Sequence, residues 1–252
     1  MKINRIYLRK DELLKMAEAE RAFVLLAGHM QNELNSLNKV FVGCLHSSSL
    51  NRTSTIESFA NGAQAMIYAR ILAGKLCEAW EALQKAFFGT VLSKRVEPKL
   101  HPVAQDALKK IKSYFSKSNS IFRVRHSFAF HYSIEEFNTH WEEALDEQTT
   151  EFIILGGTVG NNLYLAAELV ANTALLNGIN SSDKAEALHT FYDDVQSTVS
   201  NFQKFFEGAI LAILEEQLGY SCLEMNGREE EIFPVHSLSE VTIPFFFKPD
   251  VD

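Results

Sequence analysis

The 252-residue sequence is poor in the residues that define several common protein classes. It contains three cysteines, five prolines, twelve glycines and two tryptophans. Cys44, Cys77 and Cys222 are odd in number and lie far apart within apolar, helix-like patterns. This spacing is typical neither of a disulfide framework nor of a zinc site. We therefore expect buried thiols in a reducing cytoplasm, with no metal and no cofactor.

Long apolar runs are also lacking. No window of roughly 18 residues is apolar and free of charge, as a membrane-spanning helix requires. The nearest candidate, residues 152–176, is interrupted by Glu168 and several asparagines. Charged residues between positions 5 and 12 break the first apolar run, which is unlike a signal peptide. The sequence predicts a cytoplasmic protein without a membrane partner.

Helical periodicity fills most of the chain. Apolar residues recur mainly at spacings of three, four and seven, and this pattern predicts helices over 11–46, 54–92, 103–116, 133–145, 161–177 and 183–218. Ser54 with Glu57, Ser133 with Glu136, and Asp183 with Glu186 are capping signals at helix starts, and Gly219 is a C-terminal cap. We therefore predict an all-α bundle of long helices in one domain, residues 1–219, with a short extended segment near 151–158.

Residues 220–252 do not follow the helical pattern. Ile232, Phe233 and the stretch 241–247 are apolar, whereas prolines at 234, 244 and 249 limit any strand ladder. An exposed apolar stretch of this kind needs a surface to cover it. We expect an irregular hydrophobic tail that packs on the same domain or on a partner subunit.

The net charge of −8 conceals a basic block. Residues 93–126 contain nine Lys and Arg against two acids, a net charge of +7. Such a block favours RNA or another anionic partner, and a solvated lysine-rich helix face is the alternative interpretation. The candidate nucleic-acid-binding residues in the block are Lys109, Lys110, Lys112, Lys117 and Arg123.

Several motifs of catalysis and metal binding are missing. The glycine-rich stretch 156–161 is followed by Asn162 instead of the Lys and Ser or Thr of a phosphate-binding P-loop, so it is interpreted as a turn. No His-Glu-x-x-His pattern and no paired cysteines are present. The chemistry of the chain must therefore be sought elsewhere.

Cations, imidazoles and aromatics gather in residues 121–132, IFRVRHSFAFHY. Arg125 offers a planar fork of donors to a phosphate, and His131 can exchange a proton at neutral pH. On a straight helix, residues six apart differ by about 120° around the axis, so a distortion near Ser133 is needed to bring Arg125 and His131 together. The pair Arg95 and His101 has the same spacing, across a proline, and we interpret it as coincidental.

Arg125, a polar neighbour and then His131 in a helical chain resemble the Arg-x4-6-His motif of the HEPN superfamily. The segments NELNSLNKV (32–40) and RILAGKLCEAWEAL (70–83) are also similar to HEPN-like proteins of the abortive-infection kind. The resemblance covers roughly residues 10–218. It implies a HEPN-like bundle, a homodimer and metal-independent RNA cleavage in a defence or toxin–antitoxin system, with a cognate antitoxin as a partner.

The resemblance also implies roles for single residues. Arg125 would hold phosphate and His131 would be the acid–base group, while His126 would occupy the polar position beside the arginine. Family members commonly carry Asn or Asp there. Two alternatives stay open: a non-catalytic helical module that binds RNA, nucleotide or a partner protein through the basic block, and a structural dimer formed through the tail.

Overall fold

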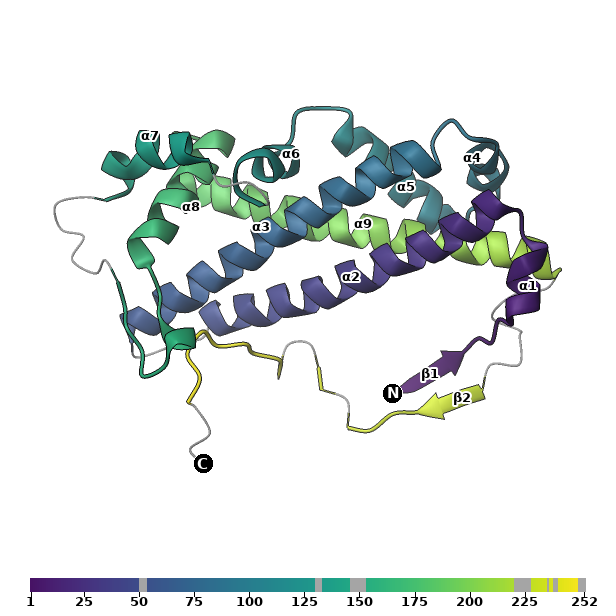
Figure 1. Cartoon of the computed structure of the whole chain (residues 1–252), viewed down its shortest axis with the longest axis horizontal. Helices are drawn as coiled ribbons and strands as arrows, with labels where there is room; N and C mark the ends of the chain where they lie inside the picture. Colours follow the sequence, from purple (N-terminus) through teal and green to yellow (C-terminus); the bar gives the residue numbers. More distant parts are fainter. Residues whose placement is uncertain are drawn as a thin grey trace. The chain divides into compact units, whose positions relative to one another are not determined.

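The computed structural model describes residues 1–49, 54–129, 133–145, 153–219, 228–234, 236–237 and 240–248. Helices account for most of these residues, and the only named strands among them form one two-stranded sheet. The predicted all-α helical bundle is confirmed (Figure 1).

The helices differ widely in length. They are α1 (Lys10–Lys15), α2 (Glu18–Ser49), α3 (Thr55–Ala86), α4 (Val91–Val96), α5 (Pro102–Phe115), α6 (Ser120–Val124), α7 (Ile134–Ala144), α8 (Leu165–Ile179) and α9 (Lys184–Leu218). The strands are β1 (Lys2–Arg5) and β2 (Arg228–Glu231), which pair antiparallel, with Lys2 opposite Glu231.

The chain forms two compact units, each assembled from three separate stretches. The first unit comprises residues 1–35, 78–117 and 198–237. The second comprises residues 36–77, 118–197 and 238–252. The boundary between the units falls inside α2, α3 and α9, so each of these helices supplies residues to both.

Aromatic rings fill the core of the first unit. Phe23 of α2 stacks on Phe87 at 4.9 Å between centroids, and Phe87 meets Phe205 of α9 edge-on at 5.4 Å. Trp80 of α3 stacks on Phe115 of α5 at 4.9 Å. Such ring pairs contribute roughly 0.5–1.5 kcal/mol each beyond the area that they bury.

The core of the second unit combines aromatic rings with small and aliphatic side chains. Phe41 of α2 meets Tyr192 of α9 edge-on at 5.4 Å. Ala60 and Ala63 of α3 pack against Leu163 and Leu165 at the start of α8. Small alanine side chains allow the backbone of α3 to approach these leucines closely.

Three capping predictions are confirmed by hydrogen bonds. The Ser54 hydroxyl accepts the amide of Glu57 at 3.4 Å, and the Asp183 carboxylate accepts the amide of Glu186 at 2.9 Å. The third signal, at Ser133, is described with the candidate site. Gly219 follows α9 with a φ of 74°, in the left-handed region that a C-terminal cap requires.

Two predicted helices have different bounds in the structure. The pattern over 11–46 predicts one helix, but Met16 has an extended backbone with ψ of 147° and separates α1 from α2. The Met16 side chain is buried against Leu214 of α9, so tertiary packing favours the break. The helix predicted over 54–92 ends at Ala86, and α4 begins separately at Val91.

Extended structure is sparse, as expected. In the segment predicted near 151–158, Ile154 exchanges two backbone hydrogen bonds of 2.8 Å with Leu163, and residues 151–152 lie outside the described residues. The sequence did not reveal the β1–β2 pair. Its second strand reads REEE, which has low β propensity, and its partner lies at the opposite end of the chain.

Candidate functional site

The basic helix α5 carries lysines whose charges already have partners. Lys110 lies 2.7 Å from Asp106 on the same helix face. The Lys112 ammonium donates to both oxygens of Glu97, at 2.8 and 2.9 Å, and lies 5.0 Å from the centre of the Phe88 ring. Two of the predicted RNA-binding lysines are therefore engaged by carboxylates within the chain.

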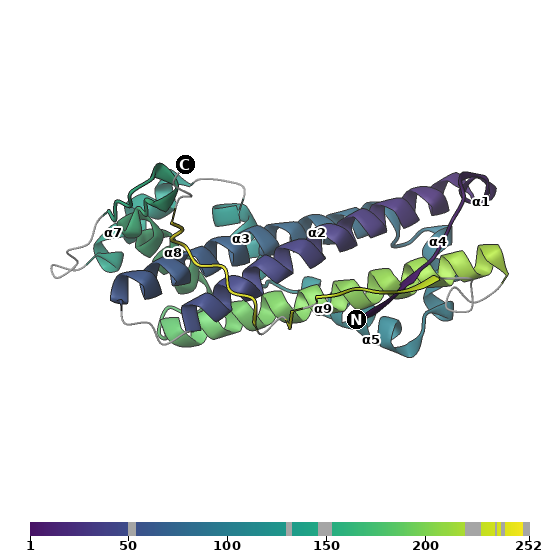
Figure 2. The same cartoon turned by 90° about the horizontal axis from the view of Figure 1, so that it is seen from below.

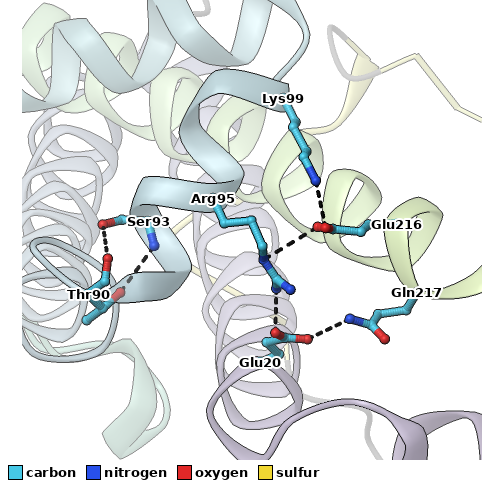
Figure 3. A network of polar contacts seen from close by, with 7 residues as sticks. All are labelled: Glu20, Thr90, Ser93, Arg95, Lys99, Glu216 and Gln217. Atoms are coloured by element: carbon cyan, nitrogen blue, oxygen red, sulfur yellow. Dashed lines mark hydrogen bonds and ion pairs between the residues drawn. The ribbon is translucent and has the colours of Figure 1, made fainter.

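Arg95 of α4 is the centre of a larger polar network in the first unit (Figure 3). Its guanidinium donates to Glu20 of α2 at 2.5 Å and lies 3.5 Å from Glu216 of α9. Lys99 donates to the other oxygen of Glu216 at 2.6 Å, and Gln217 donates to Glu20 at 2.8 Å. Figure 3 shows the Arg95 side chain reaching between the two carboxylates.

This network is held in place by the start of α4. The Thr90 hydroxyl accepts the amide of Ser93 at 3.2 Å, while the Ser93 hydroxyl donates to the Thr90 carbonyl at 3.0 Å. Glu20 is only 8% exposed, so it needs the cation beside it. The second Arg–His match of the sequence thus has its arginine committed to carboxylates, whereas His101 is exposed and accepts the amide of Val103 at the start of α5.

The segment predicted to carry chemistry begins with α6. Asn119 caps this helix by accepting the amide of Phe122 at 2.9 Å, and the Ser120 hydroxyl donates to Asp194 of α9 at 2.6 Å. Ile121 and Val124 are fully buried. The apolar residues of the segment thus fix α6 in the second unit and set the direction of the residues that follow.

A π-helical turn, residues Arg125–Ala129, follows α6 directly. π-helical turns are rare and occur frequently at functional sites, because the extra residue widens the helix and changes which side chains share a face. Arg125 is half-buried and His126 is exposed. His131 lies outside the described residues, so the structure places two of the three predicted catalytic residues.

Helix α7 begins soon after this turn. The Ser133 hydroxyl accepts the amide of Glu136 at 3.3 Å, which confirms the predicted cap. A π-helical turn and a capped helix start therefore bracket residues 130–132 in the sequence. This is the place where the sequence requires a distortion if Arg125 and His131 are to act together.

Arg123 lies across α8. A Cβ atom added at Gly178 would be 2.6 Å from Cδ and 2.7 Å from Nη1 of Arg123, so any other residue there would displace this side chain. Arg123 also lines a hollow of about 330 Å³ with Ser118, Thr190 and Asp194. The helix predicted over 161–177 corresponds to α8, which begins at Leu165 and continues past Gly178 to Ile179.

The remaining candidate cations lie on the surface. Lys117 is exposed just beyond the end of α5. Lys109 is exposed and, with Pro98, Leu108 and Lys112, lines a hollow of about 410 Å³. The structure therefore pairs Lys110 and Lys112 with carboxylates and places Lys109 and Lys117 at exposed positions.

A second polar cluster joins α7, α8 and α9 in the second unit. Glu143 accepts from Asn177 at 2.5 Å and from Lys184 at 2.8 Å. The hydrogen bond from Lys184, followed by that from Asn177, lowers the pKa of the Glu143 carboxyl below its ordinary value of 4.5. His140 lies 3.4 Å from Glu136, so its nearest acidic neighbour in this set is one turn earlier on its own helix.

Sequence reasoning missed a partly buried ion pair. Arg70 of α3 is 8% exposed and donates to Glu168 at 2.7 Å and to Asn172 at 3.3 Å, both on α8. The available signal was the i, i+4 spacing of these two polar residues within an otherwise apolar helix. Burial raises the pKa of the nearby Tyr192, and it raises the pKa of the Cys44 thiol to about 11, which keeps that thiol protonated and unreactive.

Within the described ranges, no group of three or more His, Cys, Asp or Glu side chains is arranged to hold a metal ion. No helix among them is long and apolar enough to cross a membrane. Comparisons with protein-family models, curated proteins and solved structures gave no match.

Proposed function

We propose that this chain is a HEPN-like helical protein that cleaves RNA without a metal ion, with Arg125, His126 and His131 at the reacting phosphate. The observation that supports the proposal is the π-helical turn. This turn begins at Arg125, ends at Ala129 and precedes the capped start of α7. It supplies a distortion of α-helical geometry within the motif, where residues six apart on a straight helix would diverge.

The residues suit the chemistry of phosphodiester cleavage. Arg125 offers paired N–H donors to the phosphate and neutralises the charge that develops on it. His131 takes the proton of the ribose 2′-hydroxyl or gives one to the leaving oxygen, because an imidazole titrates near neutral pH. Attack of the 2′-oxygen on phosphorus expels the 5′-oxygen and leaves a 2′,3′-cyclic phosphate. The exposed His126 adds a further donor beside Arg125.

The direct test incubates the purified full chain with end-labelled single-stranded RNA in EDTA. We expect cleavage products that end in 2′,3′-cyclic phosphate. His131→Ala should reduce the rate by about 10²–10⁴-fold, the usual contribution of general acid–base catalysis, without changing the circular dichroism spectrum. Cleavage that persists at the wild-type rate in folded His131→Ala would rule out the role assigned to this residue.

The chain supplies its own matched control. His101 follows Arg95 at the same spacing, but Arg95 is held by Glu20 and Glu216. We therefore expect His101→Ala to cleave RNA as the wild type does. Equal losses in His101→Ala and His131→Ala would show that the assay follows something other than the proposed site.

A non-catalytic module that binds RNA, nucleotide or a partner protein is the second candidate. The hollow lined by Lys109 and Lys112 favours it, since an anion there would meet Lys109 at the surface. In that case the chain binds RNA without cutting it, and replacing Lys109, Lys110 and Lys112 by Gln abolishes binding. Because Lys110 and Lys112 already have carboxylate partners, we rank this candidate second.

A further inference from the structure

The C-terminal residues 240–248, called the arm below, lie along the second unit outside any named helix or strand (Figure 2). Their backbone is bound at alternate positions. The amide of Ile243 donates to the Gly43 carbonyl at 3.2 Å, that of Phe245 to Asn61 at 2.8 Å, and that of Phe247 to Asn161 at 2.9 Å. Pro244, which has no N–H, lies between two of these donors, so the arm is recognised with the period of an extended chain.

Two of these acceptors are the side chains of buried asparagines. Asn61 and Asn161 are 2% and 9% exposed, and the side-chain amide of each both donates and accepts a hydrogen bond. Asn61 also donates to the Ser47 carbonyl at 3.4 Å, which orients its oxygen toward the arm. Asn161 returns a hydrogen bond of 2.7 Å to the Phe247 carbonyl, so it pairs with both backbone groups of one residue. His46 lies 3.3 Å from the Val241 carbonyl.

Apolar contacts accompany these hydrogen bonds. Phe245 and Phe246 pack against the cluster of Ala60, Ala63, Leu163 and Leu165. At the other end of the arm, a Cβ atom on Gly43 would lie 3.0 Å from Cγ1 of Ile243, so the absence of a side chain lets the arm approach α2 closely. We call the surface formed by Gly43, His46, Asn61, Asn161 and this cluster the arm groove.

The arm groove forms its hydrogen bonds with the backbone of its ligand. Side-chain amides of two asparagines and one main-chain carbonyl accept N–H groups that every extended segment offers, and the apolar cluster selects large apolar side chains.

We propose that the arm groove is a peptide-recognition site, which the chain's own arm fills until an extended apolar segment of another protein displaces it. Tethering gives the arm an effective concentration on the order of millimolar. An incoming segment must therefore offer the same alternating N–H donors and a pair of adjacent aromatic side chains, and bind more tightly than the arm does. The bound arm itself defines this chemistry.

The test uses the full chain with a weakened arm. Phe245→Ser with Phe246→Ser removes the aromatic contacts of the arm with the Ala–Leu cluster and changes no residue of the groove. The probe is a fluorescein-labelled peptide with the sequence of residues 240–248, EVTIPFFFK, and a scrambled peptide is the control. We expect 1:1 binding of the probe by the arm variant and at least about tenfold weaker binding by the wild type, whose own arm competes.

A groove substitution identifies the site. Asn161→Ala in the weakened-arm variant should weaken probe binding at least about tenfold, because Phe247 loses both hydrogen bonds. Asn138→Ala, at an exposed position of α7, should leave probe binding unchanged. Circular dichroism and thermal unfolding establish that each variant is folded.

Three results would overturn the proposal. A folded weakened-arm variant that does not bind the probe shows that the groove is no independent site. Equal binding by the wild type shows that the arm does not compete. A wild-type dimer that becomes monomeric in the weakened-arm variant assigns the groove to the arm of a second copy.

Discussion

At the scale of single residues, the second unit contains the partly buried ion pair Arg70–Glu168. Their side chains are 9% and 22% exposed, and the guanidinium also reaches Asn172. Removing charges from water is costly, and the pair offsets this cost only while both members are present. A substitution that breaks this pair therefore lowers the stability of the fold strongly. The residues next to Arg70 in the sequence do not indicate this role.

Glu168→Ala should lower the free energy of unfolding by about 3–5 kcal/mol, because it leaves Arg70 buried without a carboxylate. Urea unfolding followed by circular dichroism measures the change. The control is Asp106→Ala, which removes an ion pair whose two side chains are each 60% exposed and should cost at most about 1 kcal/mol. Equal effects of the two substitutions would contradict the buried role of Arg70.

The ionisation of Glu143 makes the stability of the fold depend on pH. Its pKa is lowered by Lys184 and Asn177, so the folded chain binds this proton less readily than the unfolded chain does. The resulting stability is present above the ordinary pKa of 4.5 and is lost as the pH falls through the lower, folded pKa.

We therefore expect Glu143→Gln to be less stable than the wild type at neutral pH, with the difference shrinking at acid pH, below 4.5. Thermal unfolding over a pH series measures it. Glu142→Gln, at the exposed neighbouring position of α7, is the control for the loss of one carboxylate. A stability difference that stays constant into the acid range would argue against the assigned ionic contact.

At the scale of elements, the start of α7 is set by one side chain. The Ser133 hydroxyl satisfies the amide of Glu136, and the π-helical turn ends four residues earlier at Ala129. The cap therefore fixes where the chain re-enters a helix after the candidate site. The sequence alone revealed this boundary, because a capping signal is read from four consecutive residues.

Ser133→Ala should cost about 0.5–2 kcal/mol through the loss of this cap and should speed amide exchange at the first turn of α7. Hydrogen exchange read by mass spectrometry measures the second effect. Ser133→Thr retains a hydroxyl and should restore most of the stability. If Ser133→Ala exchanges as slowly as the wild type, packing of α7 on α8 rather than the cap determines the boundary.

The π-helical turn shows the limit of reading elements from sequence. Residues 121–132 indicate a helix with some distortion, but neither the type of distortion nor its position follows from apolar periodicity. The burial of Ile121 and Val124, together with the hydrogen bond from Ser120 to Asp194, fixes α6 in the tertiary structure. The chain beyond α6 must adapt to that constraint, and an added residue in the turn is one way to do so.

At the scale of the whole molecule, three helices are shared by two compact units. Helix α2 contributes Phe23 to the first core and Phe41 to the second, and α9 likewise contributes Phe205 and Phe191. A helix propagates order cooperatively along its length, because each added residue closes a further hydrogen bond. The two cores are thus joined through unbroken backbone.

We therefore expect one cooperative unfolding transition. The two tryptophans report on the two units separately, since Trp80 lies in the first and Trp141 in the second. Fluorescence melts of Trp80→Phe and Trp141→Phe should give the same midpoint, after correction for any change in overall stability seen by circular dichroism. Two distinct midpoints would show that the units unfold independently.

The sequence by itself determined the all-α class, most helix bounds and the caps at Ser54, Ser133 and Asp183. These features depend on hydrogen bonds and periodicity within a few residues. Only the tertiary structure decided which charges are available to a ligand. Arg95 appears free in the sequence, yet it pairs with Glu20, 75 residues away. Contacts over such separations depend on how the helices pack, and the same packing determines the groove in which the arm lies.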